Sequence, residues 1–335
     1  MLPGAYSLFR WKAIKGAPLD AFFKNVTRTE IPTCAEANEY LAEDRIMCLQ
    51  IYIKTQERYS LAFVPDAKAY TDAPPNMMTL IKQRRRWMNG SLFGTSKVIA
   101  NFVNMISCRK TKHPCCRQIM MAIFMTYTST LFVLQFFIVG AMFASIYVFF
   151  EQVFASVFSG SWALDKFFGD GTMTEIFAYV YIFLLVLCLI IALALPLDRA
   201  KPCFMITTIL FGLMTLACIF GMCFYLAESG FFPEEKEFDK STWQWHGTGK
   251  HYFSPLVLAG VIMLGIYVVP IVMRPIDFLE NFRGYIVGLM SYLMLIPMFT
   301  NVFQIYAMSN LHDISWGNRP SNTTGTEAFS AKVAI

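Results

Sequence analysis

Long apolar runs dominate the second half of the chain. Those long enough to cross about 30 Å of hydrocarbon as helices are residues 119–150, 176–195, 203–226, 253–272 and 285–308. The first of these five runs is over-long for one crossing and is expected to tilt or to continue beyond the bilayer. No ionisable residue lies deep within a run, which disfavours a carrier driven by protons or ions. The pattern predicts a bundle of membrane helices over residues 119–308.

Residues 1–118 carry shorter apolar stretches separated by polar ones, as in a water-soluble α/β domain. A Pro-Gly turn leads into a predicted strand within residues 2–12, and a second strand is predicted over Tyr59–Val64, ended by Pro-Asp. Between them, the spacing of apolar positions predicts a helix from about Ala35 through Ile53.

The stretch from Pro74 to about Phe102 is predicted to be an amphipathic helix, with Asn76 as its N-cap. Basic residues interrupt its apolar positions, so we expect it to lie on the membrane surface rather than to cross the bilayer. Gly90 and Gly94 are expected to loosen or break this helix.

Composition agrees with a membrane protein, because 56% of the residues are hydrophobic and only 15% are charged. Basic residues gather before the first apolar run and in the links around residues 199–201 and 274–283, whereas the loop over residues 227–252 is acidic. By the positive-inside rule, residues 1–118 are expected in the cytosol. The net charge of +5 therefore indicates topology or an anionic ligand, and no pattern typical of nucleic-acid binding is present. The spacing of Cys108, His113, Cys115 and Cys116 fits no common zinc site.

A basic cluster, Gln83-Arg84-Arg85-Arg86-Trp87, lies on the predicted surface helix. Helical spacing puts Gln83, Arg86 and Trp87 on one face, with Arg84 and Arg85 to its sides. Guanidinium groups bind phosphate oxygens, and an indole offers a flat surface for a sugar ring. A basic helix lying on anionic lipid explains the same residues, so this stretch alone leaves both interpretations open.

Three further motifs are weaker taken singly: the turn Leu2-Pro3-Gly4-Ala5, the acidic triplet Glu43-Asp44-Arg45, and Ser315-Trp316-Gly317 after the last apolar run. Adjacent carboxylates can abstract a proton when an arginine fixes their position, although such a triplet is also common in solvated helix turns. A tryptophan beside a membrane is usually an interface anchor.

The order and spacing of these motifs resemble the chitin synthases, which are processive, membrane-embedded family 2 glycosyltransferases. The resemblance implies the late part of a GT-A-type α/β domain, an interfacial helix and a transmembrane bundle. It divides the chain into 1–73, the C-terminal part of the cytosolic domain; 74–118, the interfacial region; 119–308, the membrane helices; and 309–335, a tail. Asn318 stands where the family usually has threonine.

The same resemblance implies roles for the motif residues. Asp44 would be the base that deprotonates the 4-hydroxyl of the growing chain, supported by Glu43 and Arg45. Gln83, Arg84, Arg85, Arg86, Trp87 and Trp316 would bind substrate, and Leu2, Pro3, Gly4 and Ala5 would gate the channel entrance. The implied partners are UDP-GlcNAc, the nascent chitin chain and the plasma-membrane bilayer, with a homo-oligomer also possible.

Two features depart from this expectation. The family binds Mg²⁺ or Mn²⁺ through a D-x-D motif, which is absent from the sequence. We therefore expect a C-terminal portion of a synthase that lacks the metal site and is inactive by itself. The alternatives are a non-catalytic channel or pseudoenzyme subunit, or a synthase of hyaluronan or cellulose type.

The number of crossings is the second departure. Five crossings would place Trp316 outside the cell, so we expect that one apolar run does not cross. Asn322 begins a glycosylation sequon that would suit the outside.

Overall fold

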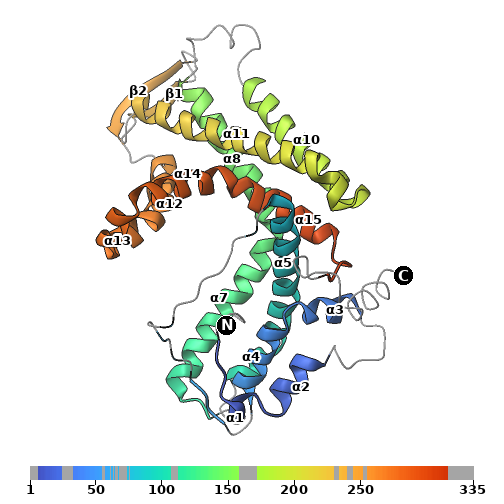
Figure 1. The fold of residues 1–335 in the computed structure, drawn as a ribbon. Coiled ribbons are helices and arrows are strands. Elements are labelled where there is room, and N and C mark those ends of the chain that lie inside the picture. The colour runs from blue at the N-terminus through green and yellow to red at the C-terminus, as the bar shows by residue number, and fades with distance from the viewer. Residues whose placement is uncertain are drawn as a thin grey trace. The chain divides into compact units, whose positions relative to one another are not determined.

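The computed structural model describes residues 7–24, 33–54, 57–60, 62, 64, 67, 74, 76–106, 112–157, 172–229, 234–239, 244–251 and 255–315. The chain divides into two compact units (Figure 1). The first unit comprises residues 1–138, 188–201 and 303–335, and the second comprises residues 139–187 and 202–302.

The described part of the first unit is helical. Its helices are α1 (Trp11–Ile14), α2 (Ala17–Phe23), α3 (Cys34–Tyr40), α4 (Glu43–Ile53), α5 (Met77–Ala100), α6 (Phe102–Ile106), α7 (Cys115–Leu134) and α15 (Gln304–Ser309). The longest of the helices before α7 is α5, which packs against α3, α4, α6, α7 and α15 (Figure 1). The side chain of Asn76 accepts a hydrogen bond from the backbone N–H of Thr79 at 2.9 Å, which confirms Asn76 as the N-cap of α5.

The expected α/β character of residues 1–118 is not confirmed, because their described parts contain no strand. At Tyr59 the physical reason is visible. Its backbone carbonyl accepts a hydrogen bond from the guanidinium of Arg117 at 3.0 Å, and its hydroxyl donates to the carbonyl of Lys12 at 3.1 Å. Side chains therefore satisfy polar groups that a strand would pair with a neighbouring strand. Residues 2–6 of the other expected strand lie outside the described residues.

Two expectations about helices are corrected. The predicted helix over residues 35–53 is two helices, α3 and α4, separated by a turn at Leu41 and Ala42. Thr33 and Glu36 form a capping box that begins α3, which fixes its start upstream of Ala35. Helix α5 continues through Gly90 and Gly94, because both glycines face packed neighbours that hold the helix in place.

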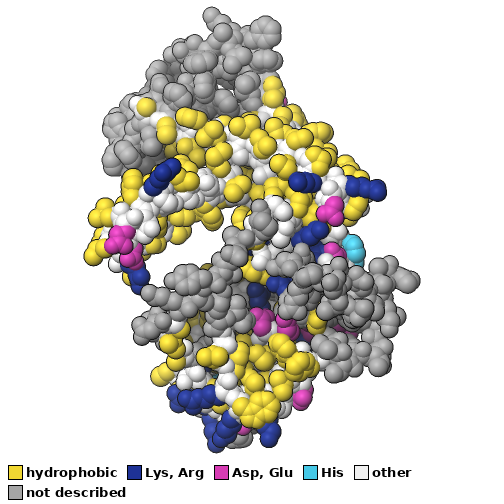
Figure 2. Space-filling model, viewed as in Figure 1, with side chains coloured by type: hydrophobic (Ala, Val, Ile, Leu, Met, Phe, Trp, Pro, Cys, Tyr) yellow, Lys and Arg dark blue, Asp and Glu magenta, His cyan; other side chains and the backbone are white. Residues whose placement is uncertain are grey.

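The second unit is built on membrane-type helices. It contains α8 (Ile138–Val157), most of α10 (Thr172–Ala194) and α11 (Leu197–Ser229), then α12 (Pro255–Met273), α13 (Pro275–Glu280) and α14 (Phe282–Pro297). Two antiparallel strands, β1 (Glu234–Asp239) and β2 (Gln244–His251), lie between α11 and α12. On the face drawn in Figure 2, apolar side chains cover most of the described surface of these helices.

Within the described residues, four helices are long and apolar enough to cross a membrane: Cys115–Glu151, Thr174–Ala194, Leu197–Cys223 and Phe282–Ser309. The first is 37 residues long and passes through a 3₁₀ turn, η1 (Gln135–Phe137), so the over-long first run is confirmed. The expected run over residues 253–272 is α12, which is not among these four.

A buried polar contact joins two segments of membrane helix inside the second unit. Asn301 donates a hydrogen bond to the hydroxyl of Tyr181 at 2.6 Å, and both side chains are fully buried. Asn301 lies in η2 (Met298–Phe303), a stretch of π-helix that follows Pro297. The ring of Phe211 packs edge-on against that of Tyr181, with the ring centroids 5.2 Å apart.

Candidate active site

The acidic triplet begins α4. Glu43 and Asp44 occupy its first turn and are half-buried. The unpaired N–H groups at the start of a helix favour negative side chains, and Asp44 Oδ1 accepts a hydrogen bond from the backbone N–H of Arg45 at 2.8 Å. The sequence therefore places two carboxylates at a fixed helix start.

Two glycines of α5 bring this helix start close to the basic motif. A Cβ atom on Gly90 would lie 3.0 Å from the carbonyl oxygen of Leu41, and one on Gly94 would lie 3.3 Å from Cβ of Ala42. Larger residues at either position would push the α3–α4 turn away from α5. The guanidinium of Arg45 adds a hydrogen bond to the hydroxyl of Ser91 on α5. The acidic triplet is thus held by its own arginine and by glycine contact.

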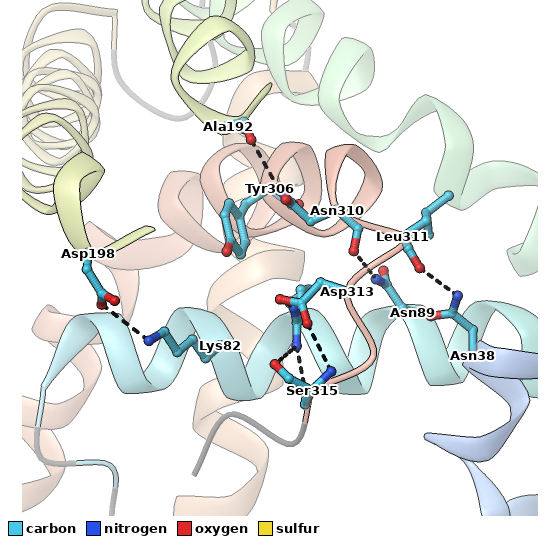
Figure 3. Close-up of polar contacts among 11 residues, drawn as sticks. Asn38, Lys82, Asn89, Ala192, Asp198, Tyr306, Asn310, Leu311, Asp313 and Ser315 are labelled. Carbon is cyan, nitrogen blue, oxygen red and sulfur yellow. Dashed lines mark hydrogen bonds and ion pairs between the residues drawn. The ribbon is translucent and has the colours of Figure 1, made fainter. Parts of the chain in front are cut away.

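Arg85 is the buried member of the basic cluster, with 1% of its side chain exposed. It forms an ion pair with Asp313, and its Nη2 donates to the backbone carbonyl of Ser315 at 2.7 Å and to the Ser315 hydroxyl at 3.1 Å (Figure 3). Burial lowers the pKa of Arg85 to about 10, which leaves the guanidinium charged at neutral pH. The buried face of α5 runs through Ile81, Arg85 and Asn89.

The other members of the cluster are less enclosed. Trp87 is 43% exposed, and the guanidinium of Arg84 lies over its ring at 4.6 Å. Burial lowers the pKa of Arg84 as well. Gln83 and Arg86 are half-buried. The prediction that these residues lie on one helix is confirmed, and the exposed indole with a cation over its face can receive a flat polar ring.

A segment after α15, residues 310–315, lies along α3 and α5 and is called the strap here. Three side chains that are 0–1% exposed donate to its backbone carbonyls (Figure 3). Asn38 donates to Leu311 at 2.8 Å, Arg85 to Ser315 at 2.7 Å, and Asn89 to Asn310 at 3.4 Å. The side chain of Asn310 also donates to the carbonyl of Ala192 at 3.3 Å.

A small cleft of about 190 Å³ opens beside the acidic triplet. Its lining combines apolar, carboxylate and amine side chains from α2 to α5: Ala21, Phe22, Lys24, Glu39, Tyr40, Glu43, Ile46, Gln50 and Lys97. Lys97 forms an ion pair with Glu39 across this lining. Neither residue was predicted, since their spacing of 58 residues forms no local motif.

The remaining predicted residues stand as follows. Leu2, Pro3, Gly4, Ala5 and Trp316 lie outside the described residues. Asp313, Asn38 and Asn89 were missed, because no local pattern marks a polar side chain whose partner comes from a distant segment. No group of three or more histidine, cysteine or carboxylate side chains gathers as metal ligands in the described part of the chain.

Comparison with known proteins shows which domain and which proteins the chain is similar to. Residues 1–102, which precede the long apolar helices, match the model of the chitin synthase-like glycosyltransferase domain. The chain is 28% identical over 345 residues to chitin synthase 2 of Mycosarcoma maydis, covering 99% of this chain and 30% of that protein. It is 26% identical over 324 residues to chitin synthase 1 of Phytophthora sojae, covering 95% and 32%. It is 29% identical over 343 residues to chitin synthase 2 of Cryptococcus neoformans, covering 99% and 34%.

The chain is therefore similar to the chitin synthases over nearly its whole length, which confirms the resemblance drawn from the motifs. It spans about a third of the length of these curated relatives.

Proposed function

We propose that the chain carries the acceptor-binding and membrane part of a chitin synthase, which transfers N-acetylglucosamine from UDP-GlcNAc to a growing β-1,4-linked chain. The observation that carries this proposal is the packing of the Leu41–Ala42 turn on Gly90 and Gly94. That contact fixes the carboxylates that begin α4 against the helix that bears the arginine cluster. Transfer to a hydroxyl needs both a base and positive charge beside the leaving diphosphate.

In the proposed reaction, Asp44 takes the proton of the 4-hydroxyl of the terminal sugar as that oxygen attacks the anomeric carbon of the donor. The bond from that carbon to the UDP oxygen breaks in the same step, so the configuration inverts. Arg45, hydrogen-bonded to Ser91, keeps α4 in place during the transfer. Glu43 lies beside the base on the wall of the cleft, where its charge favours a polar ligand.

We assign Arg84 and Arg86 the role of stabilising the charge that develops on the diphosphate. Trp87 is assigned the binding of the terminal sugar ring. Support comes from the exposure of the Trp87 indole and from the cation that lies over it. Gln83, one turn before Trp87, can contribute hydrogen bonds to sugar hydroxyls.

A divalent metal, Mg²⁺ or Mn²⁺, is expected for this glycosyltransferase family and would neutralise the diphosphate. The residues present do not fit such a site, since the sequence has no D-x-D pair. No step is assigned to a metal on this chain, and we propose that these 335 residues alone do not turn over UDP-GlcNAc.

The contacts of the strap bear on the topology. Arg85 on α5 bonds directly to Asp313 and Ser315, so both segments lie on the same side of the membrane. An even number of crossings must then separate them, and we propose four, with α5 and the strap in the cytosol of a multi-pass plasma-membrane protein. Asn322 is expected to remain unmodified, and an endoglycosidase-sensitive shift in mobility would contradict this topology.

The competing function is a non-catalytic channel or pseudoenzyme subunit. The decisive experiment replaces the aligned segment of the Mycosarcoma maydis chitin synthase 2 with these 335 residues and measures chitinase-sensitive polymer formed from labelled UDP-GlcNAc. We expect polymer from the chimera, and none when Asp44→Asn is introduced. Asp198→Asn, which removes an exposed carboxylate, is the matched control.

Polymer from Asp44→Asn at the level of the unaltered chimera would remove Asp44 from its role. A membrane-inserted chimera that makes no polymer would favour the non-catalytic function.

A further inference from the structure

The strap is recognised mainly through its backbone. Asn38, Arg85 and Asn89 are buried polar side chains on two different helices, and each donates to a carbonyl of residues 310–315. Leaving a buried donor without an acceptor costs more than a hydrogen bond normally contributes, so these three side chains favour the docked strap over a displaced one. Helices α3 and α5 thus form a receptor for this segment.

Asp313 makes one contact within the strap and one with α5. Its Oδ1 accepts the backbone N–H of Ser315 at 2.9 Å, while the same carboxylate pairs with the buried guanidinium of Arg85. The Asp313 side chain is 33% exposed, whereas that of Arg85 is 1% exposed. Asp313 is therefore the charge that allows Arg85 to be buried.

Ile314 gives the strap an apolar contact with the other motif. It is 3% exposed and packs with Ala37 and Leu41, and Leu41 belongs to the turn directly before Glu43. The strap therefore contacts the arginine-bearing helix through Asp313 and Ser315, and the start of the acidic triplet through Ile314.

We propose that the strap positions the two motifs of the acceptor site relative to each other, with Asp313 as its main positioning residue and Arg85 as its receptor. Arg85 is then structural rather than a ligand for the diphosphate, which leaves Arg84 and Arg86 for substrate. The consequence for the reaction rests on the proposed function, whereas the docking of the strap does not. Because the strap directly follows α15, the proposal also ties the last apolar helix to the site.

Docking is tested first, by hydrogen exchange on the purified 335-residue chain in detergent, with mass analysis of peptides that cover residues 310–315. Asp313→Asn should speed exchange there by about tenfold to a hundredfold, the range expected for loss of a hydrogen bond to a charged group. Asp198→Asn, which breaks the exposed pair with Lys82, should leave that exchange unchanged. Unchanged exchange in Asp313→Asn would overturn the docking role.

Positioning is tested in the chimeric synthase described above, in membranes supplied with UDP-GlcNAc. Asp313→Asn should lower kcat by about a hundredfold, the loss that a misplacement of about 1 Å can cause. KM for UDP-GlcNAc should stay within about twofold, because the proposal assigns the strap to positioning and not to donor binding. Asp313→Glu should recover part of kcat, since it keeps the charge.

Two results separate the claims. A strap released in Asp313→Asn together with unchanged kcat would overturn the positioning role. If the unaltered chimera makes no polymer, the proposed function fails, and the exchange experiment still decides whether Arg85 and Asp313 hold the strap.

Discussion

Arg84 and Arg85 are neighbours in the sequence and have opposite surroundings. Arg85 is enclosed, paired with Asp313 and bonded to Ser315, whereas Arg84 lies over the half-exposed ring of Trp87. One residue along a helix turns a side chain by about 100°, and here that rotation carries a guanidinium from the outer face of α5 to the interior. A run of like residues in a motif therefore does not imply like roles.

Of the two arginines, the buried Arg85 should contribute more to stability, so its replacement is the first test of the difference between them. Arg85→Met leaves the partly exposed carboxylate of Asp313 and the carbonyl of Ser315 without their donor, and we expect the free energy of unfolding of the first unit to fall by about 1.5–3 kcal/mol. Urea unfolding of the detergent-solubilised chain, followed by tryptophan fluorescence, measures this loss. Arg85→Met combined with Asp313→Asn should recover part of it. A loss as large in Arg84→Met would contradict the assignment.

Gly90 tests the contact that brings the two motifs together. Gly90→Ala places a Cβ atom 3.0 Å from the carbonyl oxygen of Leu41, so we expect a loss of about 1–3 kcal/mol despite the better helix propensity of alanine. Gly288→Ala is the control, because no atom lies within 4 Å of the added Cβ. The same unfolding measurement applies to both. A Gly90→Ala variant as stable as the unaltered chain would show that α4 is not held against α5.

His113 is a second buried basic side chain, and it tests how burial of such a group makes stability depend on pH. Burial lowers its pKa, the charges of Arg117 and Arg58 lower it further, and the carbonyl of Tyr52, 3.2 Å from Nε2, acts in the opposite direction. Below about pH 6.5 the unfolded chain therefore binds a proton that the folded chain binds only at lower pH, so stability falls as pH falls through this range. The melting temperature at pH 7.5 and 5.5 measures the effect. In His113→Gln the difference in melting temperature between the two pH values should be smaller. An equal difference would show that other groups cause the pH dependence.

Trp87 should show the smallest effect on stability. Trp87→Ala removes a half-exposed ring and its contact with Arg84, so we expect the free energy of unfolding to change by less than about 1 kcal/mol. In the chimeric synthase, the same change should weaken use of soluble N-acetylglucosamine oligomers as acceptors. Trp87→Phe should retain more of that activity. A Trp87→Ala variant with normal acceptor use would leave the indole without its proposed role.

The sequence was a good guide where a signal is local. The helix after Asn76 was predictable because its cap and its apolar positions are consecutive, and the membrane runs were predictable from their length. The triplet Glu43-Asp44-Arg45 could be placed on a helix, but not at a helix start, since the turn at Leu41 is favoured by its packing on Gly90. The role of Gly90 therefore required the structure.

Long-range partners could not be predicted in the same way. The periodicity of α5 indicates that Arg85 and Asn89 share a face. The acceptors that allow these polar side chains to be buried, however, lie in the strap. Nothing near Asp313 in the sequence marks it as the partner of a buried cation. A polar residue on a helix face that is otherwise apolar therefore indicates a long-range partner, but the sequence does not identify that partner.

The separation of 230 residues between Arg85 and Ser315 has a consequence for biosynthesis. At about 5–20 residues per second, a ribosome needs on the order of ten to fifty seconds to make the intervening chain. Throughout that time α5 has emerged without the acceptors for its buried guanidinium, while the membrane helices are still being inserted. The proposed acceptor site is thus completed only after the last helix has been made, and a chain released early would present an unsatisfied arginine to quality-control proteases.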